Sequence, residues 1–117
     1  MLSRDDCIRL RHMVDAAREA MSFVAGRSRV DLDSDVMLSR ALVNCLAVVG
    51  EAAAHLSPEA RACDASVPWP QIVGMRNRLI HAYFDIDQDE VWLAVTEDLP
   101  TLADRLQSIL DAACQES

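Results

Sequence analysis

Apolar residues recur every three or four positions through most of the chain, the spacing that places them on one face of an α-helix. In the first segment they form a single stripe: Cys7, Leu10, Val14, Ala17, Met21 and Val24. Ser3 and Asp6 precede this stripe with the spacing of a capping box, which satisfies free N–H groups of a first helical turn. The pattern predicts a helix that opens at Ser3 and ends near Gly26.

A second helix is predicted from near Asp33 or Ser34 to about Leu56. Its middle, ALVNCLAVVG, is apolar on nearly every side. Such a helix is either central to a bundle or shared with a partner chain. Ser57 and Pro58 then suit the cap and the first position of one short helical turn.

A third helix is predicted from roughly Trp69 to Phe84. Pro68 and Pro70 impose an extended backbone before it, because the residue preceding a proline avoids the helical region. Trp69 is interpreted as an anchor of the core.

A fourth helix is predicted to begin where Asp87 and Glu90 form another capping box. Its apolar residues follow a rhythm of four and three: Trp92, Val95, Leu99, Leu102, Leu106, Ile109 and Ala113. Pro100 interrupts that rhythm, so a kink or a restart is expected there. Trp92 is interpreted as a second core anchor. Four amphipathic helices with short connections predict an all-α antiparallel bundle.

Composition agrees with one helical domain over residues 1–117. Half of the residues are hydrophobic, and glycine and proline are few. The net charge of −8 excludes a global field that attracts nucleic acid or anionic membranes, so RNA binding would need a local basic patch. Every cation is an arginine, which suits bidentate phosphate contacts but also follows from codon bias.

The four cysteines form no CxxC pair. They are interpreted as small buried hydrophobic residues in a reducing compartment, and no zinc site is expected. No signal peptide is recognised, and no apolar run reaches the roughly 20 residues that span a bilayer. These observations favour a cytoplasmic protein.

One stretch, GMRNRLIHAYFDID, combines groups that are suited to RNA chemistry. On a continuous helix with about 100° per residue, Arg76 and Tyr83 share one stripe, and Asn77 and His81 share the neighbouring one. A histidine can deprotonate a ribose 2′-hydroxyl or protonate the leaving 5′-oxygen. An arginine can bind the phosphate and stabilise the charge of the transition state. Asn77 can hold a phosphate or ribose oxygen, and no metal or other cofactor is required.

Structural interpretations of the same residues stay open. His81 can be a hydrogen-bonded core histidine, and Tyr83 a packing aromatic with its hydroxyl at the rim. Arg76 and Arg78 can pair with surface carboxylates. Asn77 can be an ordinary exposed amide.

RNRLIHAY, residues 76–83, resembles the R-x4-H-x-Y motif of HepT-like proteins, within the HEPN ribonuclease superfamily. VVGEAAAHLSPEAR, VPWPQIVGMRNRLIHAYFDID and VWLAVTEDLPTLADRL also resemble that family in order and spacing. The resemblance covers nearly the whole chain. It implies a HEPN-like bundle of four to five helices that forms a homodimer through the motif helices.

The resemblance also implies a function. HepT-like proteins are toxins of type VII toxin–antitoxin pairs, whose MntA-like nucleotidyltransferase antitoxin transfers AMP onto the motif tyrosine. Carried over, Arg76 and His81 would be catalytic with support from Asn77, Tyr83 would accept AMP, and RNA would be cut, in some members tRNA. Two protomers would together offer Arg76 and Arg78 as four cations to the RNA.

Glu51 is a further candidate for a supporting role. It follows Gly50 at the end of an apolar run, where a carboxylate is costly unless it is paired. It can orient Arg76 or His81, or it can pair with His55 four residues later.

Two other functions remain as alternatives. A HEPN domain can be a non-catalytic helical partner that binds and positions a nucleotidyltransferase, but intact Arg76 and His81 favour the enzyme. An antitoxin or nucleotide-binding module is the other alternative, and the absence of a glycine-rich phosphate loop counts against it.

Overall fold

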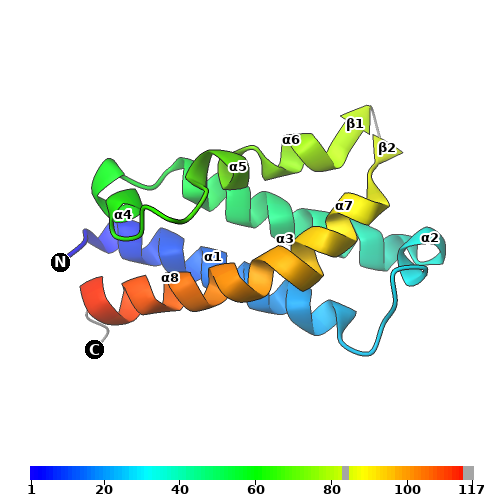
Figure 1. Ribbon diagram of the computed structural model, residues 1–117, viewed down its shortest axis with the longest axis horizontal. Helices are drawn as coiled ribbons and strands as arrows, with labels where there is room; N and C mark the ends of the chain where they lie inside the picture. Colours follow the sequence, from blue (N-terminus) through cyan, green and yellow to red (C-terminus); the bar gives the residue numbers. More distant parts are fainter. Residues whose placement is uncertain (83–84, 115–117) are drawn as a thin grey trace.

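Three long helical segments lie side by side in the computed structural model, and a chain of short elements crosses one of their faces (Figure 1). The structure describes residues 1–82 and 85–114, and of residues 81 and 82 the backbone alone. The described part is an all-α helical bundle, as predicted, with one short β-hairpin at its edge. The largest fully buried side chains are mostly leucines: Leu10, Leu42, Leu46, Leu79, Leu99, Leu106 and Leu110.

The first helix, α1 (Arg4–Val24), begins and ends as predicted. The hydroxyl of Ser3 accepts a hydrogen bond from the backbone N–H of Asp6 at 3.1 Å. Beyond the last turn, Gly26 has a φ of +74°, a left-handed conformation that costs glycine little and favours it just past a helix end. The apolar stripe faces α3 and α8, the two helices that contact α1 most extensively.

The predicted second helix is interrupted. A short helix, α2 (Asp31–Ser34), comes first, and α3 (Val36–Ala54) begins only after Asp35. Asp35 has an extended backbone, and its carboxylate accepts from the N–H of Leu38 at 3.0 Å. Arg27 holds the same carboxylate at 2.8 Å. The prediction of one helix from Asp33 or Ser34 is therefore wrong, because Asp35 caps a new helix instead of continuing the old one.

Helix α3 is the central helix of the bundle. It contacts α1, α2, α5, α6 and α7. By length and apolarity alone α3 would also suit a membrane span. No apolar run of that length was predicted from the sequence. The core helix of a bundle satisfies the same criterion, since it too is apolar along its whole length.

The predicted third helix is broken twice. It consists of α5 (Trp69–Val73) and α6 (Met75–Leu79), with Gly74 between them. The chain then leaves the helix at Ile80, where φ is −118° and ψ is 109°. It forms β1 (Ile80–Ala82), which pairs antiparallel with β2 (Asp85–Ile86).

One hydrogen bond explains the end of α6. The carbonyl of Leu79 accepts from the backbone N–H of Asp87 at 2.8 Å. In a continuing α-helix that carbonyl would bind the N–H four residues later. A helix from Trp69 to Phe84 is therefore wrong beyond Leu79, because tertiary pairing with the returning strand replaces the helical bond.

The last helical segment runs through α7 (Gln88–Leu93), η1 (Ala94–Asp98) and α8 (Leu99–Ala113). Asp87 caps α7 by accepting from the N–H of Glu90 at 3.1 Å, as predicted. The segment η1 is π-helical and lies just before Pro100. A proline has no N–H to donate, and its ring clashes with the carbonyl four residues earlier, here that of Thr96. The predicted interruption at Pro100 is confirmed as this π-helical segment.

Both tryptophans contribute to the core, as predicted. Trp69 is buried, and its indole N–H donates to the carbonyls of Arg61 at 3.0 Å and Asp64 at 3.1 Å. Trp92 is half-buried and packs against the core. The indole of Trp69 thereby ties the start of α5 to the end of α4 (Pro58–Ala62).

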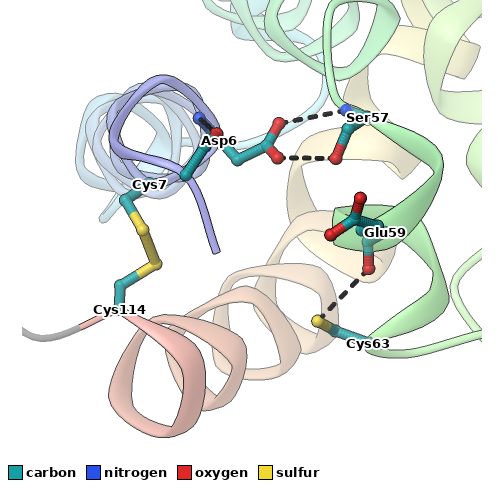
Figure 2. The surroundings of a disulfide bond; sticks show 7 residues. Asp6, Cys7, Ser57, Glu59, Cys63 and Cys114 are labelled. Carbon is teal, nitrogen blue, oxygen red and sulfur yellow. Dashed lines mark hydrogen bonds between the residues drawn. A yellow bond between two sulfur atoms is a disulfide. The ribbon is translucent and has the colours of Figure 1, made fainter. Parts of the chain in front are cut away.

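A buried carboxylate ties the N-terminus of α4 to α1. Asp6 is 5% exposed and accepts from the backbone N–H of Ser57 at 3.0 Å and from its hydroxyl at 2.5 Å (Figure 2). Ser57 in turn caps α4, as predicted. Burial raises the pKa of Asp6, but the hydrogen bonds from Ser57 and Ser3 favour the charged form more strongly. The net result is a pKa below the ordinary value of 3.8.

The cysteines depart from the sequence prediction. Cys7 on α1 and Cys114 just after α8 form a disulfide, with their Cα atoms 5.8 Å apart (Figure 2). The interpretation of all four as free thiols is therefore wrong for this pair. Spacing could not show it, because 107 positions separate the two residues and only the antiparallel bundle brings them together. Cys63 is free and exposed, against the expectation of burial.

Cys45 fits the prediction of a buried free thiol. Burial and the nearby carboxylate of Glu19, at 3.4 Å from the sulfur, raise the pKa of Cys45 to about 12. A thiol of this kind stays protonated at neutral pH, so Cys45 is not a nucleophile.

Reduction of the disulfide is expected to lower the free energy of unfolding by about 2–4 kcal/mol, because the bond closes a long loop in the unfolded chain. Urea unfolding with and without a thiol reductant measures this difference. Cys63→Ser, which leaves the disulfide intact, should retain the full response to reductant. Identical midpoints under both conditions would show that the bond contributes nothing.

Asp6→Asn is expected to lower the free energy of unfolding at pH 7 by about 1–3 kcal/mol, because a charged acceptor of two hydrogen bonds is lost. The folded pKa is depressed, so this stability is present above pH 3.8 and is lost as the pH falls through the folded value. The difference between wild type and variant should therefore shrink in acid. Asp5→Asn, at the exposed neighbouring position of the same turn, is the matched control, and equal losses in both variants would refute the role of Asp6.

Candidate functional site

The motif arginine Arg76 lies on α6 and lines an open groove of about 660 Å³. The other walls come from α1 and α3. The polar side chains of the groove are five: Arg9, His12, Glu51, His55 and Arg76. Its apolar lining is made of small residues of α3: Ala47, Val48 and Ala52. The tertiary fold therefore places Arg76 beside charged and titratable groups that are distant in sequence.

His55 has a defined orientation in this groove. Its Nδ1 lies 2.9 Å from the backbone carbonyl oxygen of Glu51. A carbonyl can only accept, so Nδ1 carries the proton in this contact and Nε2 is the other ring nitrogen available to a ligand. The predicted pairing of Glu51 with His55 therefore uses the backbone of Glu51, and the Glu51 carboxylate belongs to the groove lining.

Arg78 lies on the other side of α6. Two residues correspond to about 200° of rotation on a helix, so Arg76 and Arg78 point in nearly opposite directions. Arg78 lines a separate pocket of about 400 Å³ between α5–α6 and the η1–α8 segment, and it contacts the carbonyl of Gln71 at 3.5 Å. The structure thus brings Glu51 together with Arg76, but not Arg78.

The other predicted site residues lie on α6 or beyond its end. Asn77 is exposed on α6, and the backbone of His81 belongs to β1. The predicted stripes for Arg76 with Tyr83 and for Asn77 with His81 assumed a continuous helix, and that geometry is wrong beyond Leu79. The side chain of His81 and the whole of Tyr83 lie outside the described residues.

Three polar residues of this groove were not predicted from the sequence to lie there: Arg9, His12 and His55. Arg9 and His12 are one turn apart on α1, more than 60 positions before the motif. One signal was available, since the chain has only three histidines. Two of them line this groove, and the third lies two residues after the end of the helix that carries Arg76.

Gly50 sets how closely the motif segment approaches α3. A Cβ atom at this position would lie 3.0 Å from the carbonyl oxygen of Ile72 and 3.4 Å from that of Val73. Both carbonyls belong to α5, so only glycine lets the α5 backbone rest directly on α3. Because α6 follows α5 after one residue, this contact also positions Arg76 over Glu51.

Comparisons with known proteins agree on one family. The profile of the family described as "Ribonuclease HepT-like" matches residues 13–109. The chain is 35% identical over 101 residues to "Putative RNase TTE0752" of Caldanaerobacter subterraneus subsp. tengcongensis, covering 86% of this chain and 90% of that protein. It is 29% identical over 109 residues to "Putative RNase MJ1380" of Methanocaldococcus jannaschii, covering 93% of this chain and 100% of that protein.

A third relative carries the family name. The chain is 32% identical over 69 residues to "Probable ribonuclease HepT" of Thermococcus cleftensis, covering 59% of this chain and 63% of that protein. No solved structure matches.

Gly50→Val is expected to lower the free energy of unfolding by about 1–3 kcal/mol, because the added side chain meets the backbone of α5. Urea unfolding measures the loss. Gly74→Val is the matched control, since a Cβ there meets only an ordinary contact at 3.5 Å and the φ of −85° is open to any residue. A Gly50→Val variant as stable as the Gly74→Val variant would show that the close approach is not required.

Proposed function

This chain belongs to the HepT-like ribonuclease family, and from that premise we propose that it is the toxin of a type VII toxin–antitoxin pair. Membership makes it a ribonuclease of the HEPN type. The finer proposal is a metal-independent endoribonuclease with Arg76, Asn77 and His81 as its catalytic residues. The observation that carries it is the position of Arg76, exposed in an open groove that also holds Arg9, His12 and His55.

The proposed reaction needs only protein side chains. A base removes the proton of a ribose 2′-hydroxyl, and the resulting oxygen attacks the adjacent phosphorus. The bond to the 5′-oxygen breaks, and that oxygen receives a proton, which leaves a 2′,3′-cyclic phosphate and a 5′-hydroxyl. His81 would exchange one of these protons, and Arg76 would stabilise the charge on the phosphate oxygens.

Inhibition is proposed to act through Tyr83. An MntA-like nucleotidyltransferase antitoxin would transfer AMP from ATP onto this hydroxyl. The tyrosine oxygen would lose its proton and bond to the α-phosphorus, and pyrophosphate would leave. The added phosphate would carry negative charge and bulk to the segment that follows α6. It would repel RNA and compete with it for Arg76.

A homodimer is proposed as the active form. Apolar side chains remain exposed near the start of α3, away from the groove that holds Arg76: Val36 is 61% exposed and Met37 84%. A second copy could cover them through a two-fold interface, which would also double the number of motif segments in the assembly.

The cytoplasm is the proposed location, because the RNA substrate is there. Cytosolic proteins are usually kept reduced. The Cys7–Cys114 disulfide would therefore be under reducing conditions at the site of action.

His81→Ala is expected to lower RNA cleavage at least about 100-fold, the usual contribution of a general acid or base. Wild type, His81→Ala and Tyr83→Phe are incubated with total RNA in a metal chelator, and the products are analysed for 2′,3′-cyclic phosphate ends. Tyr83→Phe should cut like wild type, because Tyr83 only accepts AMP in this proposal. Arg76→Ala is tested in the same assay. Arg18→Ala removes an exposed arginine of α1 and controls for the loss of one positive charge.

The alternative function predicts a different result. A non-catalytic partner of a nucleotidyltransferase would leave every RNA pool intact, even when the protein is dimeric and free of AMP. Cleavage that requires an added metal ion would refute the metal-independent mechanism, and cleavage by fully AMP-modified protein would refute the inhibitory role of Tyr83.

A further inference from the structure

We propose that the groove formed by α1, α3 and α6 binds one ribonucleotide of the RNA strand beside the bond that is cleaved. In this assignment Arg9 and Arg76 hold phosphates, Glu51 accepts a hydrogen bond from a ribose 2′-hydroxyl, and His12 and His55 complete the polar walls. The assignment rests on the proposed function for the identity of the ligand. It adds residues of α1 and α3 that lie outside the motif.

Charge is the first argument. The protein as a whole carries −8, yet the groove lining holds two arginines against one carboxylate, with two histidines beside them. In a protein of net negative charge, a local excess of cations marks where an anion can bind. Arginine offers a planar pair of N–H donors that matches phosphate oxygens, so a phosphodiester is the anion that fits.

The shape of the groove is the second argument. A volume of about 660 Å³ falls in the range of sites for ligands of nucleotide size. Its apolar lining is made of Ala47, Val48 and Ala52, whose small side chains leave a smooth surface on α3. A planar base can lie on such a surface. The polar groups of the groove would then contact the phosphates and the ribose.

Glu51 gives the groove its preference for RNA. A carboxylate would repel a phosphate, so the presence of Glu51 in the same groove as Arg9 and Arg76 has to be explained separately. A ribose 2′-hydroxyl is a hydrogen-bond donor that DNA lacks, and an ionised carboxylate is an acceptor only. Glu51 therefore favours a ribonucleotide over a deoxyribonucleotide at this position.

The groove is also short. His12 borders a second, smaller hollow of about 220 Å³ farther along α1, and that hollow is lined by Asp15 and Glu19. These carboxylates repel a phosphate backbone, so the strand cannot continue between α1 and α3 beyond His12. The footprint on this face is accordingly one nucleotide.

Arg9→Gln is expected to weaken RNA binding about tenfold or more, the effect of one lost charged hydrogen bond. It should also lower the slope of log affinity against log salt by about 0.7, the value for one phosphate contact on a single strand. The probe is a fluorescein-labelled single-stranded RNA, measured by anisotropy at several salt concentrations with His81→Ala protein. Arg9→Lys should restore the slope and part of the affinity, which separates lost charge from lost folding.

Arg18→Gln is the matched control. It removes the same charge from the same helix, but nine residues after Arg9, about half a turn around α1. Its affinity and salt slope should equal those of the His81→Ala parent. Equal binding by the Arg9→Gln and Arg18→Gln variants would overturn the assignment, as would a parent that fails to bind RNA at low salt.

Glu51→Ala tests the ribose contact. The parent should bind the RNA more tightly than the DNA of the same sequence, and the ratio of the two affinities should fall about threefold to tenfold in the variant. Removal of a negative charge alone would strengthen both complexes and leave the ratio unchanged, and that result would refute the contact.

Cleavage by wild-type protein is measured separately, so the two proposals can fail independently. Cleavage without any effect of Arg9→Gln on binding would leave the ribonuclease function and refute the groove. Binding that depends on Arg9 in a protein that never cleaves would support the groove and refute the endoribonuclease.

Discussion

The contact between α3 and the α5 backbone at Gly50 is the constraint on which the site depends. The motif segment is not part of a long helix that could hold itself in place. It is a pair of five-residue helices, α5 and α6, that are too short to be stable alone. Their position comes from burial against α3, and a Cβ atom at position 50 would lie only 3.0 Å from the carbonyl oxygen of Ile72. Arg76 reaches the groove because this short segment lies so close to the central helix.

The opposite wall of the groove depends on the ends of the chain. Arg9 and His12 lie in the first half of α1, just after Asp6 and Cys7. The Asp6 carboxylate fixes that part of α1 to the cap of α4, and the disulfide fixes it to the end of α8 (Figure 2). Two different bonds therefore hold the same turns of α1. Their effect is local order near the groove, beyond any contribution to the stability of the whole bundle.

The end of α6 changes how the motif must be understood. An R-x4-H spacing on a helix would leave the arginine and the histidine on neighbouring stripes of one rigid surface. Here α6 ends at Leu79, and the backbone of His81 belongs to a hairpin strand whose partner returns to the Leu79 carbonyl. The two motif positions are thus carried by different elements. A shift of β1 would therefore alter the separation of these two backbone positions without any change in the bundle.

Local patterns by themselves determined the helical class, the caps at Ser3, Ser57 and Asp87, the interruption at Pro100 and the family motif around Arg76. The caps and the proline effect join residues within four positions of one another, and the motif and the helical periodicity are read along a continuous stretch, so the sequence contains the whole pattern. Tertiary structure decided the rest. The Asp35 cap and the bond from Asp87 to Leu79 compete with helix continuation, and only three-dimensional packing selects between them. The Cys7–Cys114 bond and the meeting of Arg9, His12 and His55 with Arg76 join residues far apart in the chain, for which no local periodicity carries a signal.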